Sequence, residues 1–217
     1  MKTALLIGAS GLVGNELLHR LLESEQYRKV VTLTRKQLDV VNKKLEQHVI
    51  NFNELDKYED LFSVDVVFCT LGTTMKKAKS KENFVKVDFD YPVSAAKIAK
   101  RQGVMQFFIV TAMGANQHSS IFYNQVKGNV EAAIRQLNFP SLYIIRPSLL
   151  LGKRNESRFG EDIGQALTKT IPFMFKGPLE KYKPNQASDV ANAIYKLSLK
   201  VESVTLIIES KQIEENK

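Results

Sequence analysis

The chain contains one cysteine, Cys69, no tryptophan and only 6 prolines among its 217 residues. A single cysteine excludes a secreted scaffold that is held together by intrachain disulfides. The three histidines show no metal-ligand spacing to one another or to Cys69, so we expect no metal site. A Gly-x-Ser-x-Gly elbow is also missing, which argues against a serine hydrolase.

Long apolar runs are absent as well. No stretch approaches the ~20 apolar residues of a membrane span. The apolar run at residues 4–7 is cut off by Gly8, and it is shorter than the ~7–15 residues that form the apolar part of a signal peptide. We therefore predict a cytoplasmic protein that makes no membrane contact.

Charge is abundant but unevenly distributed. The chain has 31 Lys and Arg against 23 Asp and Glu, a formal net charge of +8, yet residues 1–75 contain 9 bases and 10 acids. The excess therefore lies beyond residue 75, mostly in residues 76–86 and 146–183. We expect no nucleic-acid partner, because no reading helix or aromatic platform is recognisable. The basic segments instead indicate a positive field near an anionic ligand, with solvated lysines as the simpler alternative.

Apolar runs of strand length alternate with helical patterns almost from end to end, as is typical of repeated βα units. We predict an α/β fold: a doubly wound, Rossmann-like parallel sheet of about seven strands, with helices on both faces and a single domain over residues 1–217. The strands are expected at residues 3–7, 29–34, 48–51, 65–70, 106–111, 142–146 and 203–208. The helices are expected at residues 11–24, 54–62, 83–102, 122–137 and 188–200.

Two segments lack a clear pattern. Residues 147–187 fall between the sixth strand and the last helix, and a connection of this length is typical of a substrate loop or lid. The tail at residues 211–217 is polar, so we expect it to be frayed.

The first expected strand runs directly into Gly8-Ala-Ser-Gly-Leu-Val-Gly14, and a helical pattern follows. In a dinucleotide site the first glycine permits a tight turn, the second admits the pyrophosphate to the backbone, and the third permits close helix packing. The following helix N-terminus supplies unpaired N–H donors and a favourable dipole. A glycine-rich turn without a ligand is the simpler alternative. We predict that a dinucleotide binds at Gly8, Ser10, Gly11, Leu12, Val13 and Gly14.

The end of the second strand bears on the choice of dinucleotide. An NAD site usually places Asp or Glu about 20 residues beyond the glycine turn, where it binds the ribose 2′-hydroxyl. Here Arg35 and Lys36 follow the strand, and no acid occurs before Asp39. Because a guanidinium can bind a 2′-phosphate through two hydrogen bonds, we predict NADP(H) rather than NAD(H). A solvated basic pair at a strand end is the alternative.

Tyr123 and Lys127 are four residues apart on an expected helix, so both side chains lie on one face. The spacing arises easily by chance, but this pair begins the helix after the fifth strand. A tyrosine in water has a pKa of about 10, and a neighbouring ammonium favours the phenolate. We predict that Tyr123 exchanges a proton with a substrate oxygen. An amphipathic helix with an incidental Tyr and Lys is the alternative.

Several stretches resemble one family. The chain is similar to the atypical short-chain dehydrogenase/reductases of the Tat-interactive protein oxidoreductase group, on the evidence of Cys69-Thr-Leu-Gly-Thr-Thr74, Tyr123-Asn-Gln-Val-Lys-Gly128, Ile145-Arg-Pro-Ser148 and Ser188-Asp-Val-Ala191. The resemblance implies a Rossmann fold that binds NADP(H). It also implies cofactor contacts at Asn51 near the adenine, at Leu71, Gly72 and Thr73 near the ribose and pyrophosphate, and at Pro147 and Leu149 near the nicotinamide.

The resemblance also implies catalytic roles. Lys127 would hold the nicotinamide ribose, and the hydroxyl group of Thr111 would hydrogen-bond the substrate carbonyl. Two residues depart from the family pattern: Thr111 stands in place of the usual serine, and Asp88 stands where many extended members carry asparagine. Thr111 can replace serine chemically, whereas Asp88 is left without an assigned role.

Two functions from different classes remain. The first is an NADP(H)-dependent oxidoreductase that reduces a carbonyl or related small molecule, which could be anionic. The second is an NADP(H)-binding redox-sensing regulator of the NmrA type that does not turn over. A sugar-nucleotide epimerase or dehydratase is disfavoured, because only 70 residues follow Pro147. A homodimer or a protein partner, the substrate and the reaction direction stay open.

Overall fold

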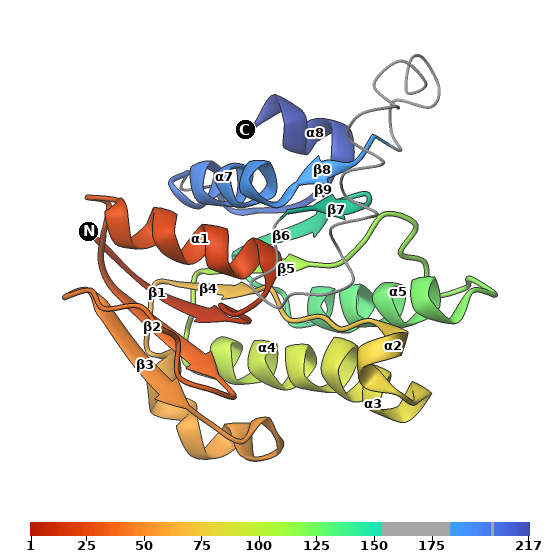
Figure 1. The fold of residues 1–217 in the computed structure, drawn as a ribbon, viewed down its shortest axis with the longest axis horizontal. Coiled ribbons are helices and arrows are strands. Elements are labelled where there is room, and N and C mark those ends of the chain that lie inside the picture. The colour runs from red at the N-terminus through yellow and green to blue at the C-terminus, as the bar shows by residue number, and fades with distance from the viewer. Residues whose placement is uncertain (153–182, 201) are drawn as a thin grey trace.

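The computed structural model describes residues 1–152, 183–200 and 202–217. Seven strands form one parallel sheet in the order β3-β2-β1-β4-β5-β6-β9 (Figure 1). Their bounds are β1 (Lys2–Ile7), β2 (Tyr27–Thr34), β3 (Leu45–Val49), β4 (Val66–Cys69), β5 (Gln106–Val110), β6 (Ser141–Arg146) and β9 (Val204–Glu209). The strand order reverses between β1 and β4, and ligands of such sheets bind at this switch point, outside the carboxyl ends of the strands.

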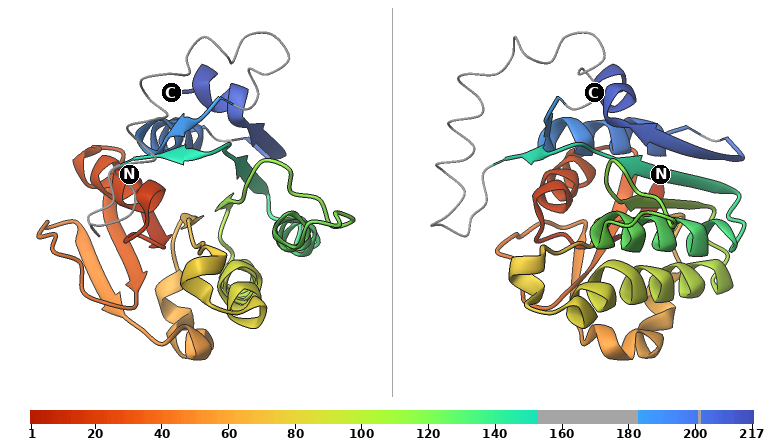
Figure 2. Two further views of the ribbon diagram at one scale, coloured as in Figure 1. Left: turned by 45° about the vertical axis from the view of Figure 1, so that its right-hand side comes forward. Right: turned by 90° about the vertical axis from the view of Figure 1, so that its right-hand side faces the viewer.

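Helices cover both faces of the sheet (Figure 2). One apolar core lies between the sheet and helices α1 (Leu12–Glu23) and α7 (Ala187–Ser198). The other lies under η1 (Phe52–Phe62), α4 (Tyr91–Arg101) and α5 (Phe122–Arg135). All residues of β4 and β5 are buried, and all but Gln106 are apolar, as expected of strands that are covered on both faces. The predicted doubly wound α/β fold is confirmed.

The edge strand β3 does not lie where its sequence pattern placed it. It was expected at residues 48–51 and is found at Leu45–Val49. Its residues are half-buried or exposed, so the apolar alternation that fixes a strand's position is weak here. Asn51 therefore lies two residues beyond the strand end and caps η1, where its side-chain oxygen accepts a hydrogen bond from the Asn53 N–H.

The helix expected at residues 83–102 is divided. A short helix α2 (Met75–Ala78) precedes α3 (Lys81–Val85), and the π-helical turn η2 (Lys86–Asp90) joins α3 to α4. The Tyr91 N–H donates to the carbonyl of Lys86, five residues back, so one extra residue is accommodated in the turn. The buried residue of this turn is consequently Asp88 rather than the apolar Val87.

The carboxyl-terminal region is more ordered than predicted. The expected frayed tail instead forms α8 (Ser210–Glu215), which begins with a capping box between Glu209 and Gln212 and buries Ile213. The ends of the predicted lid are held together by the strands β7 (Leu150–Leu151) and β8 (Asn185–Gln186). The middle of that segment, residues 153–182, lies outside the described residues. Among the helices that the structure describes, none is long and apolar enough to cross a membrane.

Candidate functional site

The turn after β1 is shaped by close backbone contacts. Gly8 has φ +95°, and a Cβ atom there would lie 2.7 Å from the carbonyl carbon of Thr70. A Cβ atom on Gly14 would lie 2.1 Å from the carbonyl oxygen of Gly8. Only glycine fits at these two positions, because backbone atoms cannot move aside. Gly11 is exposed, and the nearest atom to a Cβ there would be the Gly8 oxygen at 3.3 Å, so the middle of the turn stays open.

The first turn of α1 faces this opening with its N–H groups uncapped. Gly11 is the N-cap residue and provides no side-chain oxygen, and the first turn carries no acidic residue. The backbone donors at the start of a helix need a partner, and the helix dipole favours an anionic one. The Gly11 N–H itself donates to the carbonyl oxygen of Gly8 at 2.9 Å. The N–H groups of Leu12 and Val13 therefore fit a pyrophosphate group, as a bound dinucleotide would require.

The carboxyl end of β2 lies beside the glycine turn, because β2 pairs with β1 in register Ile7↔Leu33. Arg35 and Lys36 follow the strand and are exposed. The hydroxyl group of Thr34 is buried and has no hydrogen-bond partner within the described part of the chain. The predicted phosphate-binding pair is thus brought to the same edge of the sheet as the turn, while the contact of Asn51 with adenine stays a prediction.

The loop after β4 reaches the same edge. Leu71, Gly72 and Thr73 follow the last residue of the strand, and Gly72 is exposed. The Thr73 N–H donates to Oδ2 of Asp88 at 2.8 Å. A Cβ atom on Gly72 would lie 3.6 Å from Oδ1 of Asp88 and 3.8 Å from Nζ of Lys127. The loop backbone therefore passes directly over two charged side chains.

Lys127 and Tyr123 project from the amino-terminal half of α5. The Lys127 Nζ forms an ion pair with Oδ1 of Asp88 at 2.8 Å, and the two side chains are 5% and 0% exposed. Burial alone would lower the pKa of Lys127, but the negative charge of Asp88, helped by Tyr123, outweighs burial and raises it. Tyr123 is 37% exposed, and its ring lies 5.7 Å from that of Phe84. The structure thus combines a buried ammonium with an accessible phenol.

Thr111 follows β5 directly and is tied into a second charged cluster. Its hydroxyl group donates to Oε1 of Glu131 at 2.7 Å. Arg146, the last residue of β6, donates to both oxygens of Glu131 at 3.0 and 2.6 Å and to Glu209 at 3.0 Å. In this arrangement the proton of the Thr111 hydroxyl is engaged by Glu131, and only the lone pairs of its oxygen remain for a further partner.

The loops after β5 and β6 are joined at the same edge. The Met113 N–H donates to the carbonyl oxygen of Pro147 at 2.9 Å. Pro147 is buried, whereas Leu149 is exposed. The Asn185 side chain accepts from the Ser148 N–H and so fixes the loop that carries Leu149. Pro147 and Leu149 are therefore held beside the loop that follows Thr111.

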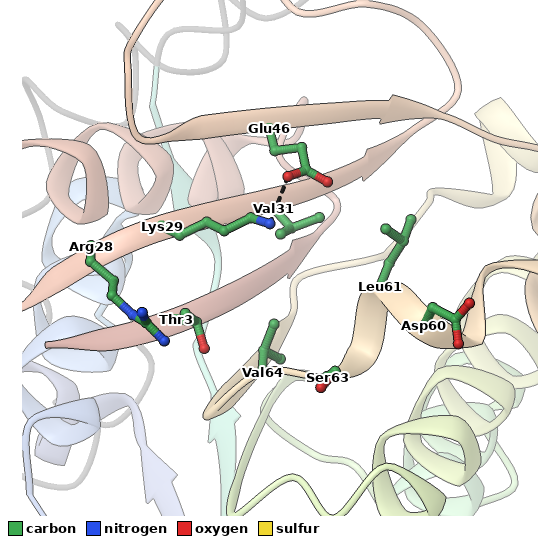
Figure 3. Close-up of a pocket in the computed structure, with 9 residues that line it drawn as sticks. All are labelled: Thr3, Arg28, Lys29, Val31, Glu46, Asp60, Leu61, Ser63 and Val64. Atoms are coloured by element: carbon green, nitrogen blue, oxygen red, sulfur yellow. Dashed lines mark ion pairs between the residues drawn. The ribbon is translucent and has the colours of Figure 1, made fainter.

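A cavity of about 440 Å³ opens at the opposite edge of the sheet (Figure 3). It is lined by Thr3, Arg28, Lys29, Val31, Glu46, Asp60, Leu61, Ser63 and Val64. These residues come from the first halves of β1, β2 and β3 and from the end of η1. The close-up shows Lys29 paired with Glu46 rather than reaching toward an open centre. The cavity therefore lies away from the glycine turn and contributes nothing to it.

Cys69 and the acidic and histidine side chains offer no alternative centre in the part of the chain that the structure describes. Burial raises the pKa of the Cys69 thiol to about 12, so it stays protonated near neutral pH and packs as a small apolar group. No group of three or more His, Cys, Asp or Glu side chains among the described residues could hold a metal ion.

Comparison with known proteins agrees with this geometry. A family model described as NAD(P)H-binding matches residues 8–160, which include the glycine turn, the β4 loop and the Tyr123 helix. The chain belongs to this NAD(P)H-binding family. It is 38% identical over 175 residues to protein HTATIP2 of Rattus norvegicus, covering 79% of this chain and 72% of that relative. The predicted resemblance to the Tat-interactive protein group is thereby confirmed.

More distant relatives share the family or the fold. The mitochondrial protein FMP52 of Candida albicans is 35% identical over 192 residues, which cover 85% of this chain and 82% of that protein. A UDP-glucose 4-epimerase of Thermotoga maritima superposes with a TM-score of 0.72 at 13% identity, covering 95% of this chain and 76% of that one. The Bordetella bronchiseptica enzyme WbmH in complex with NAD+ also gives 0.72, at 16% identity, over 99% and 78%. At such identities these two structures establish only the fold.

The candidate site contains two acidic residues whose positions the sequence did not predict. Asp88 was noted only as a departure from the family asparagine, and Glu131 was missed. Glu131 follows Lys127 by four residues and Tyr123 by eight, so helical spacing would have put all three on one face. The π-helical turn gives no comparable signal for Asp88, because an extra residue disrupts the apolar period.

Proposed function

We propose that the protein is an NADP(H)-dependent oxidoreductase of the short-chain dehydrogenase/reductase type that reduces the carbonyl group of a small molecule. The observation that carries the proposal is the accessible Tyr123 phenol beside the buried Lys127 ammonium, next to the loop after β4. A pure cofactor sensor requires neither an exposed phenol nor a buried charged lysine at this position. The binding family supports a nicotinamide cofactor, and Arg35 supports the phosphorylated form.

Different residues at the carboxyl ends of the strands would bind different parts of the dinucleotide. Leu12 and Val13 present N–H donors that suit the pyrophosphate, Gly11 leaves room for it, and the exposed Arg35 suits a 2′-phosphate. Gly72 leaves room for a ribose to approach Lys127. The bound cofactor would supply the hydride, and everything else in the reaction falls to this chain's own side chains.

Tyr123 would deliver the proton. As hydride reaches the carbonyl carbon, negative charge develops on the carbonyl oxygen, and a phenol within hydrogen-bond reach can neutralise it by proton transfer. The Lys127 ammonium stabilises the phenolate that Tyr123 then becomes. The Thr111 hydroxyl group donates to Glu131, so in this arrangement its oxygen could only accept a hydrogen bond and would not hold the carbonyl oxygen.

The substrate proposed is small and carries a carbonyl group, and the lysine-rich segment after β4 would suit an anionic one. Lys76, Lys77, Lys79 and Lys81 lie on or between α2 and α3, which follow the carboxyl end of β4. A positive field there raises the local concentration of anions. A cytosolic location stays a prediction, since the yeast relatives are named as mitochondrial proteins.

One observation favours the second function, a cofactor-binding regulator that does not turn over. The Thr111 proton is engaged by Glu131, so the hydroxyl group cannot donate to a carbonyl without rearrangement. A regulator would bind NADPH and NADP+ with different affinities and would show no consumption of NADPH with any carbonyl compound.

Replacement of Tyr123 by Phe tests the catalytic proposal. We expect NADPH oxidation with a panel of an aromatic aldehyde, an aliphatic ketone and a quinone to fall by about 10²- to 10⁴-fold, the usual contribution of a general acid. The NADPH dissociation constant should stay unchanged. Tyr91→Phe is the matched control, because its hydroxyl group contacts only the exposed side chain of Asn53 in the described structure. Turnover that survives in Tyr123→Phe would refute the role of Tyr123.

A further inference from the structure

Asp88 forms an ion pair with Lys127 whose side chains are the least exposed of any ion pair in the described residues. Asp88 lies on the π-helical turn η2, and Lys127 lies on α5, so the contact joins two separate helical segments. π-Helical turns are rare, and they occur frequently at functional sites because the extra residue redirects a side chain. Here the redirected side chain is the carboxylate that meets Lys127.

The second oxygen of this carboxylate holds the loop after β4. Oδ2 accepts the Thr73 N–H at 2.8 Å while Oδ1 faces Lys127 at 2.8 Å. A Cβ atom on Gly72, between the strand and Thr73, would lie within van der Waals distance of both charged groups. One carboxylate therefore fixes both the lysine and the backbone segment that borders the proposed ribose site.

A buried lysine without a counter-charge tends to lose its proton, because burial disfavours the ammonium. The ionisable groups that face Lys127 are Asp88 from η2, Tyr123 from its own helix and Cys69 from β4. Cys69 is a buried thiol and Tyr123 is a phenol, so Asp88 supplies the full negative charge. The Lys127 ammonium has three N–H donors, so its ion pair with Oδ1 of Asp88 leaves donors that a bound ribose could use.

We propose that Asp88 is a positioning residue of this site: it keeps the Lys127 ammonium charged, aims it under the β4 loop and locks that loop through Thr73. This inference rests on the proposed function, since it assigns Lys127 a ligand in the cofactor. It also gives a role to the one residue, Asp88, that the sequence analysis left without one. An asparagine could accept the same hydrogen bonds but would leave the buried ammonium without a counter-charge.

The charge of Lys127 can be measured without turnover. Side-chain NMR of isotopically labelled lysine, with the Lys127 signal assigned by loss in Lys127→Arg, follows its titration. We expect Asp88→Asn to lower the Lys127 titration midpoint by at least about one pH unit. Asp90→Asn is the matched control, since it removes the same charge from an exposed position of the same π-helical turn. An unchanged midpoint in folded Asp88→Asn would overturn the proposal.

Cofactor affinity tests the positioning role. In Asp88→Asn we expect NADPH binding to weaken by about fivefold or more, while Asp90→Asn binds as the wild type does. The double variant Lys127→Met/Asp88→Asn keeps the test available if Asp88→Asn fails to fold, because it removes both buried charges together. Adding Asp88→Asn to Lys127→Met should leave NADPH affinity unchanged. A further weakening in that background would show that Asp88 does not act through Lys127, and would contradict the proposal.

The two proposals fail in different ways. If the wild type binds no nicotinamide dinucleotide, or binds NADPH and turns over no carbonyl compound, the proposed function is wrong, but the Lys127 titration still reports on the ion pair. If the wild type binds and turns over NADPH while Asp88→Asn changes neither the titration nor the affinity, the function stands and the role of Asp88 is refuted.

Discussion

Charged side chains are arranged differently at the two ends of the parallel strands. We call these ends the carboxyl edge, where the glycine turn lies, and the amino edge, where the cavity opens. At the carboxyl edge, Asp88 and Lys127 are almost completely buried, and Glu131 receives three hydrogen bonds. At the amino edge, Lys29 and Glu46 form an ion pair at 2.7 Å with side chains 47% and 40% exposed. A cavity of about 440 Å³ opens at the amino edge. The buried, hydrogen-bonded charged side chains, however, lie at the carboxyl edge. Chemical organisation, rather than cavity size, therefore locates the candidate site.

The largest expected difference between the edges is in stability. We expect Glu131→Gln to reduce the free energy of unfolding by about 2–4 kcal/mol, because it removes the charge that Arg146 faces and places amide donors against its guanidinium. Glu46→Gln, the matched change at the amino edge, should cost less than about 1 kcal/mol, as for other exposed pairs. Urea unfolding of both variants measures the two values. Equal reductions of the unfolding free energy in the two variants would contradict the claim that the two ends of the strands differ.

A second difference is expected in cofactor affinity. Arg28 and Arg35 lie at opposite ends of β2, so they form a matched pair. We expect Arg35→Ala to weaken NADPH binding by about 10- to 100-fold, or ~1.4–2.7 kcal/mol, and to leave NADH binding unchanged. Arg28→Ala should alter neither constant. NADPH affinity should also fall steeply with salt, and less steeply in Arg35→Ala.

A direct binding measurement tests the predicted preference for NADP(H). Isothermal titration of the wild type with both reduced cofactors gives the two dissociation constants directly. Binding of NADH that equals or exceeds that of NADPH would refute the preference, even if the rest of the site is correct.

The smallest expected effect is a pH dependence at the amino edge. Hydrogen bonds from Lys29, and then from His48, lower the pKa of Glu46 below its ordinary value. A lowered carboxyl pKa contributes stability above the unfolded-state value of about 4.3, and this contribution is lost as the pH falls through the folded-state pKa. Because the pair is exposed, the contribution is about 0.5 kcal/mol after solvent screening. The difference in unfolding free energy between wild type and Glu46→Gln should vanish at low pH.

The fold was largely predictable because the central strands β4 and β5 are apolar except for Gln106. Such runs favour strands that are covered on both faces, and the glycine turn marks the junction of β1 with α1. The position of β3 was less predictable, since an edge strand with half-buried residues has no strong alternation. The π-helical turn η2 was not predictable, because its extra residue changes the buried face between α3 and α4.

The part of the candidate site that was predictable is the part where only one residue type fits. Glycine is required at Gly8 and Gly14, because a Cβ atom there would lie 2.7 and 2.1 Å from backbone atoms, and this requirement leaves a clear sequence pattern. The partners of Lys127 and Thr111 were not predictable in this way. Asp88 is distant in sequence from Lys127, and Glu131 is distant in sequence from Thr111. These contacts form only when the helices pack against the sheet.

Transfer of deuterium from NADPH labelled at both C4 positions of its nicotinamide tests the central claim most directly. Incubation of the wild type with this cofactor and the aldehyde or the ketone of the panel should place deuterium on the carbinol carbon of the product, as mass spectrometry would detect. Tyr123→Phe should yield a greatly reduced amount of labelled product while still binding NADPH. NADPH binding by the wild type without label transfer to the aldehyde or the ketone, and without NADPH oxidation by the quinone, would contradict the account and favour the regulator.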